Sequence, residues 1–418
     1  MGNNTMNIII HRGAEEIGGN CIELEANGKS ILLDLGMPLS GDIFGRDALP
    51  KVNGLTDGSN PDLLAIVISH PHADHYGLVS FAHPSIPVYI GAEADKMLRT
   101  AIPFSSFGAE FPITKHYSHR KTFQIGEFLI TPYLADHSAF DAYSFLIEAN
   151  GKRIFYSGDL RGHGWKAKAF ENLIKNPPNN IDAMLLEGTT LGRNEEHPAT
   201  TEAELVPQIV NAVNETSGII LAAFSGQNID RLVTFYKAAL STKRTFVADM
   251  YIANLLLAIG RKTLPNPTSG AMRIFLPQRM KSKIIRDKSF DLIAPFYENR
   301  IYQDELKEQK NNIIMSFRSS MIADLEKADC LQNGRLIYSM WSGYIERSDP
   351  NLRNWCFQHN MNFDIIHTSG HASRMDLLKL VAAIKPKCLV PIHTIAHSEY
   401  EQFGYPIMLS NNGNRLSI

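Results

Sequence analysis

Four side chains that can bind a metal occur within six residues of the chain, in the segment HPHADH at residues 70–75. Histidine is the commonest protein ligand of metals, and aspartate oxygen often completes such sites. The apolar run at residues 63–68 predicts a buried strand directly before the segment. A loop that leaves this strand can turn His70 and His72 to one side and Asp74 and His75 to the other. The segment therefore predicts two adjacent metal ions, and a solvated histidine-rich turn is the alternative.

Three further side chains of ligand type each follow an apolar run of strand length. His137 comes after residues 129–135, Asp159 after residues 153–158 and His393 after residues 389–392. Sheets of parallel type place their sites outside the carboxyl ends of the strands. Each residue alone has an ordinary explanation, such as a helix-capping aspartate. Together with the HPHADH segment, they predict one centre assembled from distant parts of the chain.

The pattern of apolar runs changes twice along the chain. The first part is rich in expected strands, which lie at residues 21–25, 31–36, 63–70, 87–91, 129–135, 142–149, 153–158 and 183–188. From about residue 200 strands and helices alternate, with strands at 219–224, 245–250, 273–276, 313–317 and 336–341 and helices at 228–240 and 252–262, which predicts a separate βαβ unit. Thr201 and Glu204 form a candidate capping box, although Pro207 is expected to kink the helix that they start. Short strands return from residue 363 around a helix at 373–384, and we expect a last strand at 405–410.

Composition excludes several classes of protein. The 418 residues include 41 basic and 43 acidic side chains, so a globally basic surface for nucleic acid is excluded, whereas a local basic groove is not. Hydrophobic residues make up 44%, which is enough for packed cores. No apolar run approaches the roughly 20 residues that span a bilayer, and no signal peptide is evident. The four cysteines show no CxxC pairing, which disfavours a disulfide framework and a thiolate zinc site. We expect a cytoplasmic protein without a membrane partner.

The HPHADH segment matches the HxHxDH motif of the metallo-β-lactamase fold, which the chain resembles over residues 7 to about 200 and again from about 360 to 418. Asp34 matches the early aspartate of that fold, which supports the ligand loop. About 200 residues separate Asp159 from the HTSGHAS segment at 367–373, as in the β-CASP nucleases, in which a second domain interrupts the lactamase fold. In that resemblance Glu187 matches the motif A acid, His371 the motif B histidine and His393 the motif C histidine.

The resemblance implies an α/β fold, with a metallo-β-lactamase αββα sandwich and an inserted β-CASP α/β domain. We expect residues 1–205 and 359–418 in the sandwich and residues 206–358 in the insert. Within the family, the segments GAEEIGGN and HTSGHA are similar to ribonuclease J. Motif A, EGTT, is closer to the cleavage-and-polyadenylation endonucleases. The chain ends soon after His393, so we expect it to lack the C-terminal domain of bacterial ribonuclease J.

These matches give each residue an expected role. His70, His72 and His137 hold one ion, Asp74, His75 and His393 hold the other, and Asp159 bridges them, because a carboxylate can offer one oxygen to each ion. The donor set suits two Zn²⁺ ions, with Mn²⁺ as the alternative. The expected catalytic residues are Asp74 with His371, which Glu187 orients and keeps protonated for the leaving 3′-oxygen. His371 as a purely structural histidine is the alternative.

The expected function is hydrolysis of phosphodiester bonds in single-stranded RNA, by in-line attack of a hydroxide shared between two ions. His367 and Ser369 are expected to contact a substrate phosphate or a terminal 5′-phosphate, and hydrogen bonds to the backbone are their alternative. The basic residues at 279–288 either belong to a nucleic-acid groove or, as we slightly prefer, form a solvated helix face. The alternatives are a DNA nuclease of the same superfamily and a non-catalytic RNA-binding subunit. The sequence leaves open exonuclease or endonuclease mode, native metal, homo-oligomerisation and biological pathway.

Overall fold

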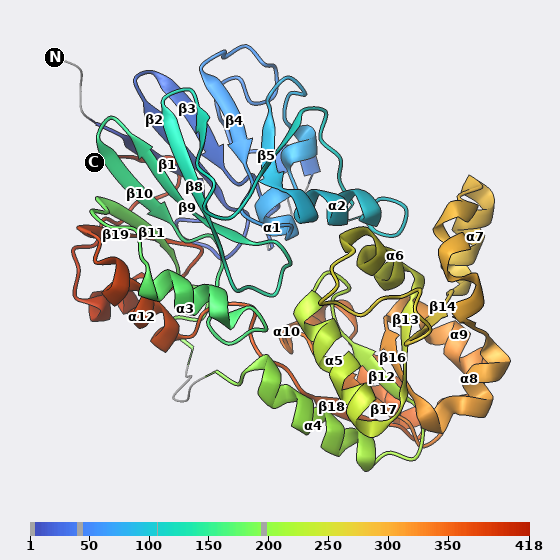
Figure 1. Ribbon diagram of the computed structural model, residues 1–418. Helices are drawn as coiled ribbons and strands as arrows, with labels where there is room; N and C mark the ends of the chain where they lie inside the picture. Colours follow the sequence, from blue (N-terminus) through green and yellow to red (C-terminus); the bar gives the residue numbers. More distant parts are fainter. Residues whose placement is uncertain (1–4, 40–44, 107, 194–198) are drawn as a thin grey trace. The chain divides into compact units, whose positions relative to one another are not determined.

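The computed structural model of the chain describes residues 5–39, 45–106, 108–193 and 199–418 (Figure 1). The chain divides into two compact units, the first with Met1–Ile102, Phe107–Ala199 and Gly370–Ile418, and the second with Pro103–Ser106 and Thr200–Ser369. These limits differ from the expected boundaries after residues 205 and 358. The difference arises because helix α4 (Glu202–Asn214) and strand β18 (Asn362–Ile365) both pack within the second unit.

The first unit contains two mixed sheets. The first sheet has seven strands in the order β20-β1-β2-β3-β4-β5-β6. Its strands are β1 (Asn7–Arg12), β2 (Cys21–Ala26), β3 (Lys29–Leu33), β4 (Leu63–Val67), β5 (Val88–Gly91), β6 (Thr114–Tyr117) and β20 (Arg415–Ser417). Strands β3 to β6 run parallel to one another, whereas β1, β2 and β20 pair antiparallel. The segment after β4 therefore leaves the carboxyl end of a strand that has parallel neighbours on both sides.

The second sheet of this unit has six strands in the order β19-β11-β10-β9-β8-β7. They are β7 (Phe123–Ile125), β8 (Phe128–Leu134), β9 (Tyr143–Ala149), β10 (Lys152–Tyr156), β11 (Ala183–Glu187) and β19 (Cys388–Ile392). Strand β19 comes from the last part of the chain and pairs parallel with β11, which in turn pairs parallel with β10. This pairing brings the carboxyl ends of three strands that are distant in sequence to one edge of the sheet.

The two sheets pack face to face, and helices cover both outer faces. Side chains alternate along each strand, so Ala65 and Val67 of β4 enter the core between the sheets while Ile66 packs outward. The outer face of the first sheet packs with helices α1 (Ala73–Tyr76) and α2 (Ala92–Ala101). The outer face of the second sheet packs with α3 (Ala167–Lys175), α12 (Arg374–Ile384) and the 3-10 helix η7 (His397–Phe403). The αββα sandwich predicted from the sequence is confirmed.

The second unit is a parallel sheet of seven strands, in the order β15-β14-β13-β16-β12-β17-β18. Its strands are β12 (Ile220–Ala223), β13 (Thr245–Asp249), β14 (Arg273–Phe275), β15 (Arg300–Ile301), β16 (Ile313–Phe317), β17 (Arg335–Tyr338) and β18. One face packs with α4, α5 (Ile229–Thr242), α6 (Met250–Ile259) and α7 (Gln278–Asp287). The other packs with α8 (Gln303–Gln309), α9 (Ile322–Lys327), α10 (Gly343–Ser348) and α11 (Leu352–Gln358).

Short 3-10 helices occur in both units. In the first unit, η1 and η2 lie at Gly45–Ala48 and Val79–Phe81. In the second unit, η3 to η6 lie at Phe290–Leu292, Ala294–Asn299, Lys310–Asn312 and Ser319–Met321.

Local chemistry explains where elements differ from the sequence-based expectation. Helix α4 starts at the Thr201–Glu204 capping box and continues through Pro207 as a helix. Helix α6 ends earlier than expected because Gly260 adopts a left-handed conformation with φ 62°. The strand expected at 405–410 is reduced to a single bridge between Ile407 and Leu389, since Pro406 has no N–H to donate to a ladder. Within the described residues, no helix combines the length and the apolar character needed to cross a bilayer.

Candidate metal centre

The HPHADH segment forms the loop after β4 and the first turn of helix α1. Backbone hydrogen bonds hold this turn, since Leu35 N donates to His75 O over 2.8 Å and Asn20 N donates to Asp74 O over 3.0 Å. A Cβ at Gly36 would lie 1.7 Å from Asp74 O, so only glycine allows the two backbones to approach this closely. The turn that carries Asp74 and His75 is therefore fixed by the neighbouring loop after β3.

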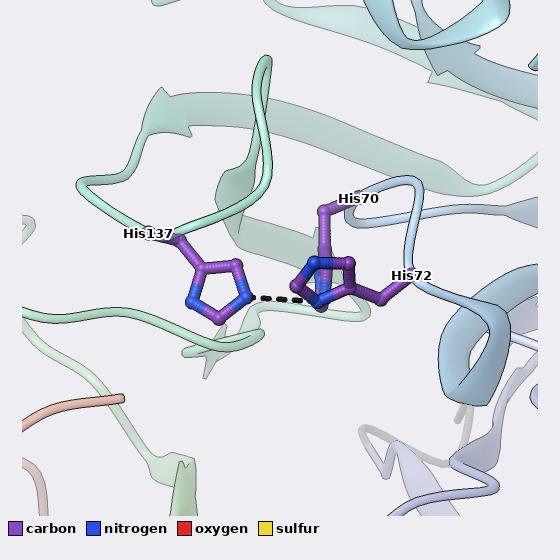
Figure 2. A group of neighbouring side chains, drawn as sticks. All are labelled: His70, His72 and His137. Carbon is purple, nitrogen blue, oxygen red and sulfur yellow. Dashed lines mark hydrogen bonds between the residues drawn. The ribbon is translucent and has the colours of Figure 1, made fainter. Parts of the chain in front are cut away.

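Three histidines form the first group of candidate ligands (Figure 2). His70, His72 and His137 each offer one ring nitrogen, and these nitrogens all lie within 4.8 Å of one another. His137 Nε2 lies 3.1 Å from His72 Nδ1, whereas the buried His70 Nε2 and His137 Nδ1 atoms have no hydrogen-bond partner among the described residues. Burial lowers the pKa of His72 to about 4 and that of His70 and His137 well below the ordinary value. The rings are therefore neutral near pH 7, and neutral imidazole is the form that binds a metal.

Asp74, His75, Asp159 and His393 form the second group of candidate ligands, again within 4.8 Å of one another. Asp159 follows β10 and His393 follows β19, so the strand order of the second sheet brings them together. His75 Nε2 lies 3.1 Å from Asp159 Oδ2, and His393 Nε2 lies 3.3 Å from Asp74 Oδ2. Burial opposes the charged form of both carboxyls, but neighbouring histidines outweigh it and hold the pKa of Asp74 and of Asp159 below the ordinary value. Both side chains are thus carboxylates, as a cation requires.

Asp159 lies next to both groups. Its Oδ2 atom is 3.6 Å from His70 Nε2 in the first group as well as 3.1 Å from His75 Nε2 in the second. Its Oδ1 atom is buried and accepts no hydrogen bond from the part of the chain that the structure describes. A buried carboxylate oxygen without a donor costs free energy unless a cation compensates it. Because nitrogen and oxygen ligand atoms converge here and one buried carboxylate oxygen is left without a donor among the described residues, the residues fit a metal centre.

Asp34 orients the ring of His75 through a contact with its Nδ1 atom. Asp34 Oδ2 accepts hydrogen bonds from His75 Nδ1 at 2.7 Å, from the Ser69 hydroxyl at 2.8 Å and from the Tyr156 hydroxyl at 2.5 Å. Asp34 is fully buried and has a left-handed backbone with φ 60°. A carboxylate that holds Nδ1–H fixes the ring so that Nε2 faces the cation, which is a usual arrangement around metal-bound histidine.

His371 and Glu187 lie beside the second group. They form a third set with Asp159 and His393, whose ligand atoms are again within 4.8 Å of one another. His371 Nδ1 lies 3.4 Å from Glu187 Oε2 and 3.7 Å from Asp159 Oδ2. Burial lowers the pKa of His371, but the two carboxylates outweigh it and raise this pKa above the ordinary value. The arrangement favours an imidazolium next to the candidate ligands.

His367 and Ser369 belong to the second compact unit and are not members of these three groups. His367 Nδ1 lies 3.2 Å from the Nη1 atom of the buried Arg231. Because a guanidinium can only donate, Nδ1 is the acceptor and the ring proton lies on Nε2. Ser369 directly precedes Gly370, the first residue of the chain's return to the first unit.

Several supporting residues were not identified from the sequence. The Thr189 hydroxyl lies 2.8 Å from His393 Nδ1, and Tyr156 contacts Asp34. The buried Asp136 carbonyl accepts from Arg161 N at 2.6 Å, and its side chain accepts from Gly164 N, which links the loops that carry His137 and Asp159. Thr189 and Asp136 are neighbours of predicted site residues, so proximity to the motifs was the available signal. The partner of Tyr156 could not be inferred from its sequence position.

Known proteins match both parts of this arrangement. The family described as "Beta-lactamase superfamily domain" matches residues 31–220, and the "Zn-dependent metallo-hydrolase RNA specificity domain" matches residues 360–398. Ribonuclease J of Mycoplasma pneumoniae is 23% identical over 94% of this chain, and that of Pyrococcus abyssi is 20% identical over 99% of it. The chain is a ribonuclease J-like protein of the β-CASP family.

The extent of the similarity differs between relatives of this ribonuclease J-like chain. It spans 98% of the Pyrococcus protein but 68% of the Mycoplasma protein and 55% of ribonuclease J from Helicobacter pylori strain 26695, to which it is 22% identical. A crystal structure of a protein of unknown function from Enterococcus faecalis V583 has the same fold, with a TM-score of 0.78 and 21% identity over 99% of this chain and 100% of that one. The zinc-dependent family description and the buried histidine–aspartate groups together indicate that the protein uses a metal.

Proposed function

We propose that the protein is a metal-dependent nuclease that hydrolyses phosphodiester bonds of single-stranded RNA and holds two divalent ions, Zn²⁺ or, alternatively, Mn²⁺. The observation that carries the proposal is the pair of adjacent donor groups, with Asp159 next to both. Ribonuclease J relatives and the RNA specificity domain support RNA as the substrate. The donors are nitrogen and oxygen only, which suits either ion.

The ligand residues would form two neighbouring binding sites, one for each ion. His70, His72 and His137 would hold one, Asp74, His75 and His393 the other, and Asp159, which lies next to both groups, would be a ligand that they share. When bound, two such ions supply an activated water near neutral pH and stabilise charge on the attacked phosphate. Asp34 and Thr189 keep the rings of His75 and His393 turned towards the centre through their Nδ1 atoms. Their contribution is to fix the donor geometry before an ion or a substrate arrives.

His371 is the residue that we assign to protonate the leaving 3′-oxygen. Its Nδ1 atom faces the carboxylates of Glu187 and Asp159, so the proton on Nε2 is the one available for transfer. Glu187 is held in place by the backbone, since Thr189 N donates to Glu187 Oε2 over 3.1 Å. A fixed carboxylate therefore keeps the imidazolium charged until the proton is given up.

His367 and Ser369 are assigned to bind a phosphate of the strand. An imidazole with its proton on Nε2 and a serine hydroxyl are both groups that can donate to a phosphate oxygen. A terminal 5′-phosphate would use the same chemistry and would favour cleavage from the 5′ end. Ser369→Ala should reduce the preference for 5′-monophosphate over 5′-hydroxyl RNA, and equal cleavage of both ends by the unmodified protein would exclude this assignment.

The test of the main proposal compares RNA and DNA of the same sequence, each labelled at the 5′ or the 3′ end. The protein is first stripped with a chelator and then reloaded with Zn²⁺ or Mn²⁺. We expect cleavage of single-stranded RNA after reloading only, and no cleavage by Asp74→Asn or Asp159→Asn at unchanged folding. If the protein prefers DNA, its substrate is DNA and not RNA. RNA binding without cleavage under every metal condition would indicate a non-catalytic subunit. Product sizes from the two labels separate release of mononucleotides from internal cuts.

A further inference from the structure

Two aromatic side chains after strand β17 are exposed in a segment that also contains a buried residue. Trp341 is 43% exposed and Tyr344 is 42% exposed, whereas Ile345, which directly follows Tyr344, is 5% exposed. The two rings meet edge to face, with centroids 5.3 Å apart. The guanidinium carbon of Arg347 lies 5.9 Å from the centroid of the Trp341 ring. We refer to Trp341, Tyr344 and Arg347 as the tryptophan cluster.

The backbone fixes the position of the indole. A Cβ at Gly343 would lie 2.3, 2.4 and 2.6 Å from three atoms of the six-membered ring of Trp341. The ring therefore rests directly on the Gly343 backbone, in space that any side chain at that position would take. Contact with the Gly343 backbone and with the Tyr344 ring means that little conformational entropy is lost when a ligand packs on the exposed part of the indole.

The loop that carries the tryptophan cluster leaves a rigid part of the second unit. Ser339, directly after β17, accepts a hydrogen bond from buried Arg231 at its carbonyl over 2.7 Å and donates its hydroxyl to Ile366 O. Arg231 also donates to Thr368 O over 3.1 Å and to both carboxylate oxygens of Glu202. The cluster thus lies at the carboxyl end of a parallel strand, where sheets of this type bind ligands, and on an anchored loop.

The chemistry of the cluster fits single-stranded nucleic acid. Every base has a π face that can stack on an aromatic ring, and every linkage carries a negative charge that a guanidinium attracts. In a hydrophobic protein-binding surface, further apolar side chains would be expected around the two rings. Here Glu346 and Arg347 next to the rings are exposed and charged. The combination of a held indole, a second ring and a cation is that of a stacking site for one unpaired base.

We propose that Trp341, supported by Gly343 and Tyr344, stacks a base of the single-stranded RNA substrate while Arg347 attracts the adjacent phosphate. The inference rests on the proposed function, because it takes the substrate class from it. It adds a position at which the strand is held, and it concerns residues outside the three candidate ligand groups.

The experiment measures binding of a fluorescein-labelled RNA of twelve nucleotides by anisotropy. Every arm uses the full chain with Asp159→Asn, so that the RNA stays intact. Trp341→Ala should weaken binding about five- to 100-fold, the range that corresponds to loss of one stacked base. Trp341→Phe should stay within about threefold of the parent because a stacking face remains. Phe357→Ala is the matched control, since Phe357 is an aromatic of the same unit that is 83% exposed, and it should bind as the parent does.

Two further arms separate stacking from loss of folding. Gly343→Ala keeps both aromatic residues but displaces the indole, so it should weaken binding about as much as Trp341→Ala while the thermal unfolding midpoint stays unchanged. A single abasic nucleotide moved along the RNA should weaken binding of the parent at one position, and this position effect should vanish in Trp341→Ala.

The outcomes distinguish this inference from the proposed function. If the parent binds RNA and the chain with intact Asp159 cleaves it, but Trp341→Ala binds as tightly as the parent, the stacking site is refuted and the nuclease stands. If the parent binds no RNA and the intact chain cleaves none, both proposals fail together. Weakening by Phe357→Ala equal to that by Trp341→Ala would also overturn the inference, because any exposed aromatic would then suffice.

Discussion

The replacement Asp34→Asn tests whether the buried carboxylate behind His75 prepares the centre for a metal. Asn has nearly the same size and tolerates the left-handed backbone of residue 34, so the loop is expected to keep its path. The change removes the negative charge and places either an amide N–H or a single acceptor oxygen where three donors converge, from Ser69, His75 and Tyr156. At least one buried donor then loses its acceptor.

The contacts of Asp34 set the expected loss of stability and the expected loss of metal affinity. Hydrogen bonds to a charged group contribute about 1.5–3 kcal/mol each, and the two hydroxyls can turn to accept from the amide. The unpaired His75 Nδ1–H then leaves a loss of about 2–3 kcal/mol in the free energy of unfolding of the metal-free protein. Loss of an orienting partner behind a metal-bound histidine typically weakens metal binding about 10- to 100-fold, which corresponds to about 1.4–2.8 kcal/mol.

The assay is competition with a fluorescent zinc chelator, and urea unfolding in excess chelator gives the stability. Tyr156→Phe is the matched control, because it removes one donor to the same oxygen and leaves the carboxylate and the His75 contact in place. It should lower stability by about 1.5–3 kcal/mol, as loss of one hydrogen bond to a charged group does, and leave zinc affinity within about threefold. If Asp34→Asn binds zinc as tightly as the unmodified protein, the idea that this carboxylate orients a metal ligand is wrong.

Three further predictions concern other parts of the chain. His371→Ala should lower the cleavage rate about 10²- to 10⁴-fold while elemental analysis finds unchanged metal content, and loss of metal would make His371 a ligand instead. Arg231→Met should destabilise the fold by about 3–5 kcal/mol in urea unfolding, because it leaves Glu202 charged and buried, and adding Glu202→Gln should restore part of the loss. Burial raises the pKa of Cys330 to about 11 and of Cys356 to about 12, so both thiols should resist iodoacetamide at pH 8 until the protein unfolds. Because the folded state opposes thiolate formation, these two thiols should reduce stability as the pH rises above about 9, and rapid labelling at pH 8 without unfolding would contradict their burial.

The structure brings the predicted ligands close together because most of them lie in loops directly after buried strands. The apolar run before HPHADH identified strand β4, and similar runs identified β10 and β19 before Asp159 and His393. Parallel pairing then places the ends of β10, β11 and β19 together, which brings Asp159, Glu187 and His393 into one group. Patterns that are local in sequence were sufficient because the regular geometry of the sheet does the rest.

Features that depend on packing between distant segments were not predicted. Nothing local to Tyr156 indicates that its hydroxyl reaches Asp34, and nothing local to Arg231 indicates that it is buried against Glu202 and Ser339. The expected unit boundaries differed for the same reason, since the pairing of β18 with β17 and the packing of α4 assign those elements to the second unit.

The sequence by itself determined the kinds of donor atom, their order along the chain and the two fold types that carry them, because side-chain chemistry and the period of apolar residues are properties of the chain. Only the tertiary structure decided which nitrogen of each histidine faces the centre, that Asp159 lies against both histidine groups, and that Trp341 is held on Gly343 with much of its ring exposed. The first two features depend on distances between segments that are far apart in the sequence, and the third depends on the path of a short loop. Both are set only after the strands have paired and the sheets have packed.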